Sequence, residues 1–300
     1  MNRALAALLT RAIDYAGVFP PAKLELASAL EHYIRYRGGA EAWILGRFAV
    51  RTSQLDELAK LLEDAIPVEP IPIAAIGRGG ADRDAWEAGL EADALGMSAF
   101  EARAEVFAAI EAFETRLPDN EHAPAWIRDL NGFSGVDLFV ELPWDEGQPD
   151  AMAAAAETDA VNVKARTGGE NAAAFPSSQR VAAFIQGATQ LGLGFKLTAG
   201  LHHAFPHRDS ELGVRMHGFV PVFAAAACSF AHDLSVRELA GILDIDSPSP
   251  FEFTDQGLRL HDWSIGLADL EETRDYLVGF GSCSVSEPLE TLARAGLDID

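Results

Sequence analysis

Two stretches of the chain repeat one pattern, and this repetition constrains the fold more than any other feature. Residues 161–169 read VNVKARTGG and residues 194–203 read GFKLTAGLHH, so each has a central lysine followed four positions later by glycine. Alternating apolar and polar residues are typical of a strand with one polar face. Lys164 and Lys196 lie 32 positions apart, roughly one βα unit of a barrel of about 250 residues. We expect adjacent parallel strands that direct both amines into one space.

Further apolar runs recur at similar intervals along the chain. The expected strands are residues 14–21, 43–50, 71–76, 100–105, 136–142, 161–166, 195–198 and 277–285. Helical patterns separate these runs, and this rhythm favours an α/β protein with a (β/α)8 TIM-like barrel over a sandwich. The fourth run is ambiguous, because its alternating charges also fit a helix that continues through Phe107 and Ile110.

The regular rhythm ends after His203. Residues 219–230 and 236–243 have helical patterns, and residues 248–261 resemble a β-hairpin that turns at the sequence DQG. We therefore expect residues 1–300 to form a single barrel domain. Within it, residues 204–276 would be an inserted helical and β-hairpin subdomain between strands seven and eight, placed over the barrel mouth.

The charge of the chain limits its partners. It contains 46 acidic and 23 basic residues, a formal net charge of −23. Nucleic acids and anionic membranes bind positive surfaces, so neither is an expected partner. An anionic small-molecule substrate would need a local basic pocket. Homo-oligomer formation stays open.

The cysteine content and the start of the chain point to the cytoplasm. Two cysteines, Cys228 and Cys283, are too few for a disulfide framework. Residues 1–10 lack the pattern of a secretory signal. We expect a cytoplasmic protein.

Residues suited to anion binding lie near the expected strand ends. In a (β/α)8 barrel the active site is at the carboxyl ends of the strands, often with an anion site in the last loops. Hydroxyls, backbone amides and basic groups there could bind a phosphate or a carboxylate, although ordinary tight turns would use the same residues. The candidate substrate-binding residues are Asp14, Arg47, Gly168, Gly169, Thr198, Gly200, His202, His203, Ser282 and Ser284.

The paired lysines favour covalent catalysis. A buried ammonium group beside a second one has a lowered pKa, so that its neutral amine can attack a carbonyl and form a Schiff base. Arg166 would reinforce this effect on Lys164, and Glu141 could act as a general acid or base. The candidate catalytic residues are therefore Lys164, Lys196, Glu141 and Arg166, with no cofactor. The structural alternative is a salt-bridged lysine at a strand end.

Two other functions remain open. A metal-dependent hydrolase or isomerase could use His202 or His203 with a carboxylate such as Glu141, and His207 and His217 are further candidate ligands. Adjacent residues of a strand point to opposite faces, so both histidines could bind one metal only from an irregular loop. The other function is a non-catalytic ligand-binding barrel.

The lysine strands resemble those of a known enzyme family. The run from Lys164 to Gly168, followed by Lys196 and Gly200 on the next strand, resembles deoxyribose-phosphate aldolase and related class I aldolases. This resemblance implies that Lys164 forms the Schiff base and that Lys196 lowers its pKa.

A second resemblance spans the whole chain. It is carried by the sequences DYAG at 14–17, PP at 20–21, KLTAGLHH at 196–203, HGF at 217–219 and FGSCS at 280–284. This combination is similar to a group of uncharacterised bacterial proteins and implies no particular activity.

Overall fold

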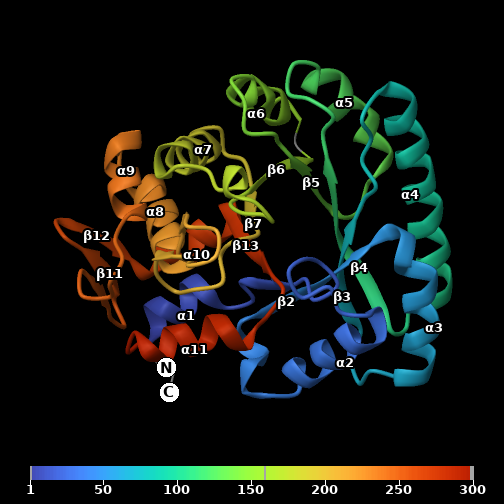
Figure 1. The fold of residues 1–300 in the computed structure, drawn as a ribbon, viewed down its shortest axis with the longest axis horizontal. Helices are drawn as coiled ribbons and strands as arrows, with labels where there is room; N and C mark the ends of the chain where they lie inside the picture. Colours follow the sequence, from blue (N-terminus) through green and yellow to red (C-terminus); the bar gives the residue numbers. More distant parts are fainter. Residues whose placement is uncertain (1, 159, 298–300) are drawn as a thin grey trace.

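A closed ring of eight parallel strands forms the centre of the molecule (Figure 1). The computed structural model describes residues 2–158 and 160–297, and it confirms the α/β, TIM-like barrel. The strands follow the order β1, β13, β7, β6, β5, β4, β3, β2 around the ring. Their bounds are β1 Ile13–Tyr15, β2 Leu45–Arg51, β3 Ile71–Ile76, β4 Ala108–Arg116, β5 Asp137–Glu141, β6 Val161–Arg166, β7 Phe195–Thr198 and β13 Leu277–Ser282.

Helices surround this ring (Figure 1). They are α1 Arg3–Leu9, α2 Leu26–Arg37, α3 Leu55–Ala65, α4 Arg83–Ala104, α5 Ala123–Asp129, α6 Gln148–Ala156, α7 Ser178–Gln190, α8 Phe219–Ala231 and α11 Ser286–Arg294, with short 3-10 turns η1 Ala40–Trp43, η2 Thr52–Gln54, η3 Leu130–Gly132 and η4 Ala172–Ala174. Helix α3 buries one apolar stripe with Leu55, Leu58 and Leu62, whereas α8 is buried on all sides from Phe219 to Cys228. No helix within residues 2–158 and 160–297 combines the length and the apolar composition needed to cross a bilayer.

Small residues fill much of the barrel interior. Ala49 of β2, Ala74 of β3 and Ala112 of β4 form an inner apolar cluster with the Phe139 ring of β5, separate from the main core between strands and helices. Alanine occupies little volume, so the upper part of the barrel has room for longer polar side chains.

The expected fourth strand was wrong. Residues 100–105 lie at the end of α4 and just beyond it, and the strand is Ala108–Arg116. Phe100 and Ala104 are buried on one helical face, whereas Glu101 and Glu105 are exposed. The alternating charges are therefore the solvent side of a helix, which ends before Phe107 and does not continue through Ile110.

The segment between β7 and β13 contains three helices, a hairpin and a small sheet. Its elements are the hairpin strands β8 His207–Arg208 and β9 Arg215–Met216, helix α8, helix α9 Val236–Leu243, the antiparallel strands β10 Phe251–Phe253, β11 Gly257–Leu260 and β12 Trp263–Gly266, and helix α10 Leu267–Tyr276. The expected β-hairpin is thus β10 and β11, extended by a third strand.

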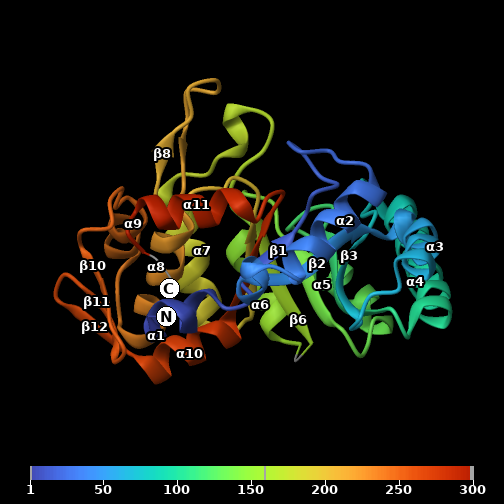
Figure 2. The same cartoon turned by 90° about the horizontal axis from the view of Figure 1, so that it is seen from below.

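The expectation that this sheet lies over the barrel mouth was wrong. The Asn2 side chain donates to the carbonyl of Phe253, and the Ala4 N–H donates to that of Thr254. These contacts attach the sheet to α1, which leads into the start of β1 and so lies toward the end opposite the mouth. The β8–β9 hairpin, by contrast, projects from the mouth face (Figure 2).

Phe113 provides a test of the fourth strand. Its ring is fully buried and stacks on Phe133 with centroids 4.3 Å apart. We expect Phe113→Ala to lower the free energy of unfolding by about 3–5 kcal/mol, because a large buried ring is lost. Urea denaturation measures this change. The control is Val106→Ala, at a side chain that is 65% exposed, which should change stability by less than about 0.5 kcal/mol. Equal losses of stability in the two variants would contradict the placement of the fourth strand.

Candidate active site

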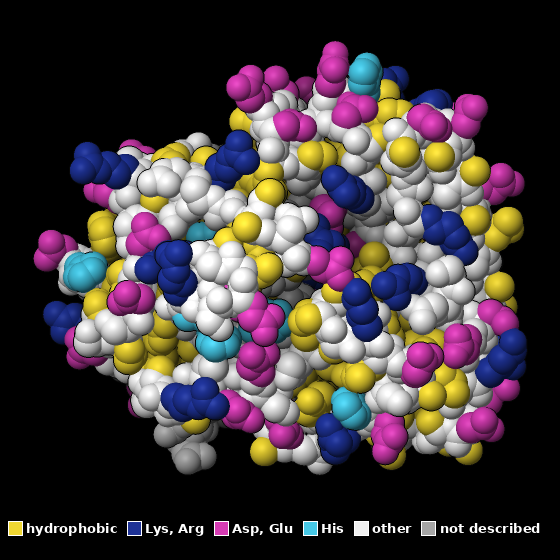
Figure 3. All heavy atoms as spheres, in the orientation of Figure 1, with side chains coloured by type: hydrophobic (Ala, Val, Ile, Leu, Met, Phe, Trp, Pro, Cys, Tyr) yellow, Lys and Arg dark blue, Asp and Glu magenta, His cyan; other side chains and the backbone are white. Residues whose placement is uncertain are grey.

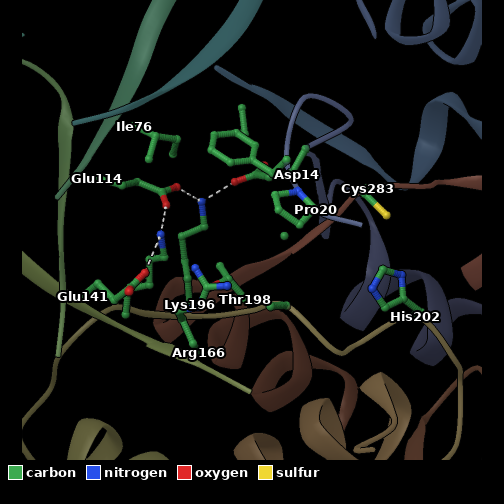
Figure 4. Close-up of a pocket in the computed structure, with 16 residues that line it drawn as sticks. Asp14, Pro20, Ile76, Glu114, Glu141, Arg166, Lys196, Thr198, His202 and Cys283 are labelled. Carbon is green, nitrogen blue, oxygen red and sulfur yellow. Dashed lines mark hydrogen bonds and ion pairs between the residues drawn. The ribbon is translucent and has the colours of Figure 1, made fainter. Parts of the chain in front are cut away.

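A cavity of about 140 Å³ opens at the carboxyl ends of the barrel strands. Figure 3 shows this face hollowed near its centre, with Lys and Arg side chains around and within the hollow. Asp14, Glu114, Glu141, Lys164 and Lys196 line the cavity (Figure 4). These five residues are all buried, and we refer to them as the lysine–carboxylate cluster.

Glu114 is shared between the two lysines. Lys164 and Lys196 are direct partners across β6 and β7, which confirms that adjacent strands place both amines in one space. The Lys164 Nζ donates to Oε2 of Glu114 at 2.8 Å, and the Lys196 Nζ donates to its Oε1. One carboxylate therefore joins both ammonium groups (Figure 4).

Each lysine has a second carboxylate partner. The Nζ of Lys164 lies 3.2 Å from Oε2 of Glu141, and that of Lys196 donates to Oδ2 of Asp14. Asp14 also accepts the Arg47 backbone N–H at 2.7 Å. The Lys196 Nζ lies 5.2 Å from the centre of the Phe139 ring, which adds a cation–π contact from below.

The carboxylates reverse the expected effect on Lys164. Burial lowers the pKa of Lys164, but the charges and hydrogen bonds of Glu114 and Glu141 outweigh it and raise that pKa above its ordinary value. Burial raises the pKa of Glu114, yet Lys164 and Lys196 lower it to about 2. The expectation that the second ammonium group lowers the pKa of Lys164 was therefore wrong, because it omitted the partner carboxylates.

Polar side chains also line the cavity nearer its mouth. They include Arg166, Thr198, His202 and Cys283. Burial lowers the pKa of His202, but Cys283 and Glu287 outweigh this effect and raise it to about 9. His202 is thus protonated at neutral pH.

The neighbouring histidine lies outside the cavity lining. A carboxylate oxygen of Glu287 is 3.3 Å from Nδ1 of His202, and the other is 3.4 Å from Nε2 of His203. His203 stacks on His207 with ring centroids 3.8 Å apart. His203 therefore contacts the β8–β9 hairpin instead of the pocket.

Arg47 lies outside the cavity as well. It is the third residue of β2, on the half of the strand away from the mouth. Its guanidinium donates to Glu111 at 3.2 Å and to Asp137 at 2.5 Å. The expected position near the end of the strand was wrong: β2 ends at Arg51, within one residue of the expected end, and Arg47 stands four residues before Arg51.

The candidate glycines are part of loop packing. A Cβ on Gly168 would lie 2.9 Å from the Cα of Gly200, and one on Gly169 would lie 2.7 Å from the Cβ of Ala174. Gly200 has a φ of +77°, which favours glycine. These residues allow the loops after β6 and β7 to approach each other and do not line the cavity.

The two candidate serines are engaged in a turn. The Ser282 hydroxyl donates to the Ser284 carbonyl at 2.7 Å, and the Ser284 hydroxyl accepts the Glu287 N–H at 3.2 Å. Neither serine lines the cavity.

The proposed metal ligands do not form one site, although His203 and His207 are stacked on each other. His217 is buried against the Pro176 carbonyl, 2.9 Å away, and Glu141 pairs with Lys164. Across residues 2–158 and 160–297, no group of three His, Cys, Asp or Glu side chains has an arrangement that could hold a metal ion.

Glu114 was missed by the sequence analysis. Its strand was placed at residues 100–105, so residue 114 fell outside every expected strand. The pattern that could have revealed it is the alternation in residues 112–116, AFETR, where Ala112 and Glu114 share one face and Phe113 points the other way.

Comparisons with known proteins add a structural likeness to solved structures. No protein-family model and no curated protein matches the chain. Among solved structures, it is similar to a mandelate racemase/muconate lactonizing protein from Herpetosiphon aurantiacus, with a TM-score of 0.33 and 14% identity over 88% of this chain and 66% of that one. The chain thus spans about two thirds of that protein's length.

The low pKa of Glu114 predicts an acid-dependent loss of stability. The carboxyl of Glu114 has a pKa near 4.5 in the unfolded chain and about 2 in the folded protein. Between these values the unfolded chain binds a proton that the folded protein does not. The stabilisation that ionised Glu114 gives the folded protein is therefore fully present above pH 4.5 and is lost as the pH falls toward 2. Between pH 6 and pH 3 this loss lowers the free energy of unfolding by roughly 2 kcal/mol. We expect Glu114→Gln to remove this part of the pH dependence measured by urea denaturation.

The matched control is Glu101→Gln, at an exposed carboxylate on α4. It should leave the pH dependence of the wild type unchanged. A stability difference between wild type and Glu114→Gln that stays constant from pH 3 to pH 6 would contradict the lowered pKa.

Proposed function

We propose that the chain is an enzyme in which Lys164 forms a Schiff base with a small carbonyl compound that bears an anionic group, for lyase or aldolase-type chemistry. The observation that carries this proposal is the pair of lysines joined by Glu114 in a small cavity at the catalytic end of a barrel. Burying ionic groups costs free energy that their pairing often fails to recover. Such a cluster in a cavity therefore favours function over stabilisation.

Accessibility favours Lys164 over Lys196 as the nucleophile. The Lys164 side chain is 9% exposed and that of Lys196 is 1% exposed. Lys196 also has Asp14 and Glu114 as close partners beside the Phe139 ring. Lys196 is thus suited to hold Glu114 in its ionised form while Lys164 meets the substrate.

Glu141 is the better base for activating Lys164. Among the described residues its carboxylate pairs with Lys164 alone, whereas Glu114 binds two ammonium groups that lower its pKa to about 2. A carboxylate with such a low pKa accepts a proton poorly. Glu141 would take one proton from Lys164, whose neutral Nζ then attacks the carbonyl carbon.

The same carboxyl can complete the reaction. After the N–C bond forms, one proton moves from the nitrogen to the former carbonyl oxygen, and Glu141 returns its own proton to the same oxygen, which leaves as water. The product iminium keeps the positive charge of the original ammonium, so the charge of the lysine–carboxylate cluster is unchanged. The iminium can then accept the electron pair of a breaking carbon–carbon bond.

Borohydride reduction with peptide mapping tests this function. The protein is incubated with small aldehydes or ketones and then reduced with borohydride. This treatment should add the mass of the reduced substrate to Lys164. Lys164→Met should abolish the label, and Glu141→Gln should slow labelling by about 100-fold, since a general acid–base group is lost.

Lys60→Met is the matched control, because Lys60 is exposed on α3 and pairs with Asp56. It should label like the wild type. Labelling confined to exposed lysines, or unchanged in Lys164→Met, would disprove the Schiff-base function.

A further inference from the structure

Arg166 and Thr198 form a second pair directly above the two lysines. They are partners across β6 and β7, two residues beyond the Lys164–Lys196 pair. Residues two apart in a strand share a face and lie about 6.6 Å apart along it. Both side chains line the same cavity as the lysines (Figure 4). An anion bound at this upper pair would therefore lie next to the reactive amine.

The Arg166 guanidinium is available for a ligand. Within residues 2–158 and 160–297 it has no hydrogen-bond or ion-pair partner, nor does the Thr198 hydroxyl. The nearby Glu170 pairs with Lys23 at 2.7 Å. The Trp144 indole N–H donates to the Arg166 carbonyl at 2.5 Å, which fixes the backbone at this strand end. A planar guanidinium binds a carboxylate through two parallel hydrogen bonds.

Three donors near the strand ends that could serve a phosphate are engaged within the protein. The Thr167 N–H donates to the Thr198 carbonyl at 2.7 Å, and the Thr167 hydroxyl donates to the Ala199 carbonyl at 2.5 Å. In the turn after β13, the Glu287 N–H donates to the Ser284 hydroxyl. Phosphate sites of barrels rely on free loop and helix N–H groups, and these three donors are not free.

The charge of the lining fits a monoanion. The three carboxylates of the lysine–carboxylate cluster are balanced by Lys164, Lys196 and Arg166. Protonated His202 adds one positive charge, and Glu287 outside the lining offsets part of it. The cavity therefore carries at most one net positive charge, which suits a carboxylate better than a phosphate dianion.

The size of the cavity sets an upper limit on the ligand. Its volume of about 140 Å³ is close to that of an engineered protein cavity of about 150 Å³ that binds benzene. A compound of three to six heavy atoms fits this space. A compound with a longer chain would have to extend through the mouth.

From these observations we propose that the substrate is a short 2-oxo carboxylate, with its carboxylate on Arg166 and Thr198 and its carbonyl carbon facing Lys164. This inference rests on the Schiff-base function and narrows its substrate. In a 2-oxo acid the carboxylate is bonded directly to the carbonyl carbon. The carboxylate therefore matches the Arg166–Thr198 pair, and the carbonyl carbon matches the adjacent Lys164–Lys196 pair on β6 and β7.

Trapping rates with three carbonyl compounds test the inference. Pyruvate is the carboxylate, hydroxyacetone the neutral compound and dihydroxyacetone phosphate the phosphate. With borohydride reduction, we expect pyruvate to label Lys164 at least about 10-fold faster than the other two. Arg166→Gln should slow pyruvate labelling by about 10- to 100-fold, the loss of a charged bidentate contact, and should slow hydroxyacetone labelling far less, because hydroxyacetone has no carboxylate. Thr198→Val should have a smaller effect in the same direction.

Arg116→Gln is the matched control. Arg116 ends β4 and is exposed, but it does not line the cavity. This variant should label like the wild type with all three compounds. Faster labelling by dihydroxyacetone phosphate, or an equal loss of pyruvate and hydroxyacetone labelling in Arg166→Gln, would overturn the carboxylate assignment while leaving the Schiff base intact.

A binding measurement separates the two proposals if no compound labels Lys164. Calorimetry with Lys164→Met measures pyruvate binding without covalent chemistry. Pyruvate should bind this variant more tightly than inorganic phosphate, and adding Arg166→Gln should weaken it by about 10-fold or more. Binding without labelling would reject the Schiff base alone. Absent or Arg166-independent pyruvate binding would reject the carboxylate site.

Discussion

The shared carboxylate of Glu114 is the interaction on which the candidate site depends. It lies between two ammonium groups in a buried space, and neither lysine could remain charged there without a partner. Glu114 is 82 residues from Lys196 in the chain, and Asp14 is 182 residues from it. Only the closure of the barrel brings these groups together, so the chemistry of the site is a consequence of the whole ring.

This network also explains how one lysine can react without disrupting the rest. Removing a single partner from a buried ion pair leaves an uncompensated charge and costs several kcal/mol. An iminium on Lys164 avoids that cost, because it keeps the positive charge that Glu114 and Glu141 already bind. Covalent attachment therefore changes the substrate while the electrostatic balance of the pocket is maintained.

The sequence predicted the lysine pair but not its partner. The spacing and alternation around Lys164 and Lys196 are local patterns, and parallel strands one βα unit apart convert them directly into neighbours. Finding Glu114 required the correct bounds of β4, and the exposed face of α4 imitated a strand. Arg47 was misplaced for a different reason. The expected end of its strand was correct to within one residue, but Arg47 stands four residues before Arg51, the last residue of β2, in the half of the strand away from the mouth, where it pairs with Glu111.

The two sides of the cavity differ in character, and this difference follows from which strands contribute large side chains. Strands β4 to β7 supply Glu114, Glu141 and the lysines, whereas β2 and β3 supply Ala49 and Ile76 to the lining. Phe19 and Pro20, in the loop after β1, extend the apolar side toward the mouth. A ligand held by its polar groups on β6 and β7 would thus place its hydrocarbon part against an apolar wall. Longer side chains on β2 or β3 would fill that space, so the alanines inside the barrel are as necessary to the pocket as its charges.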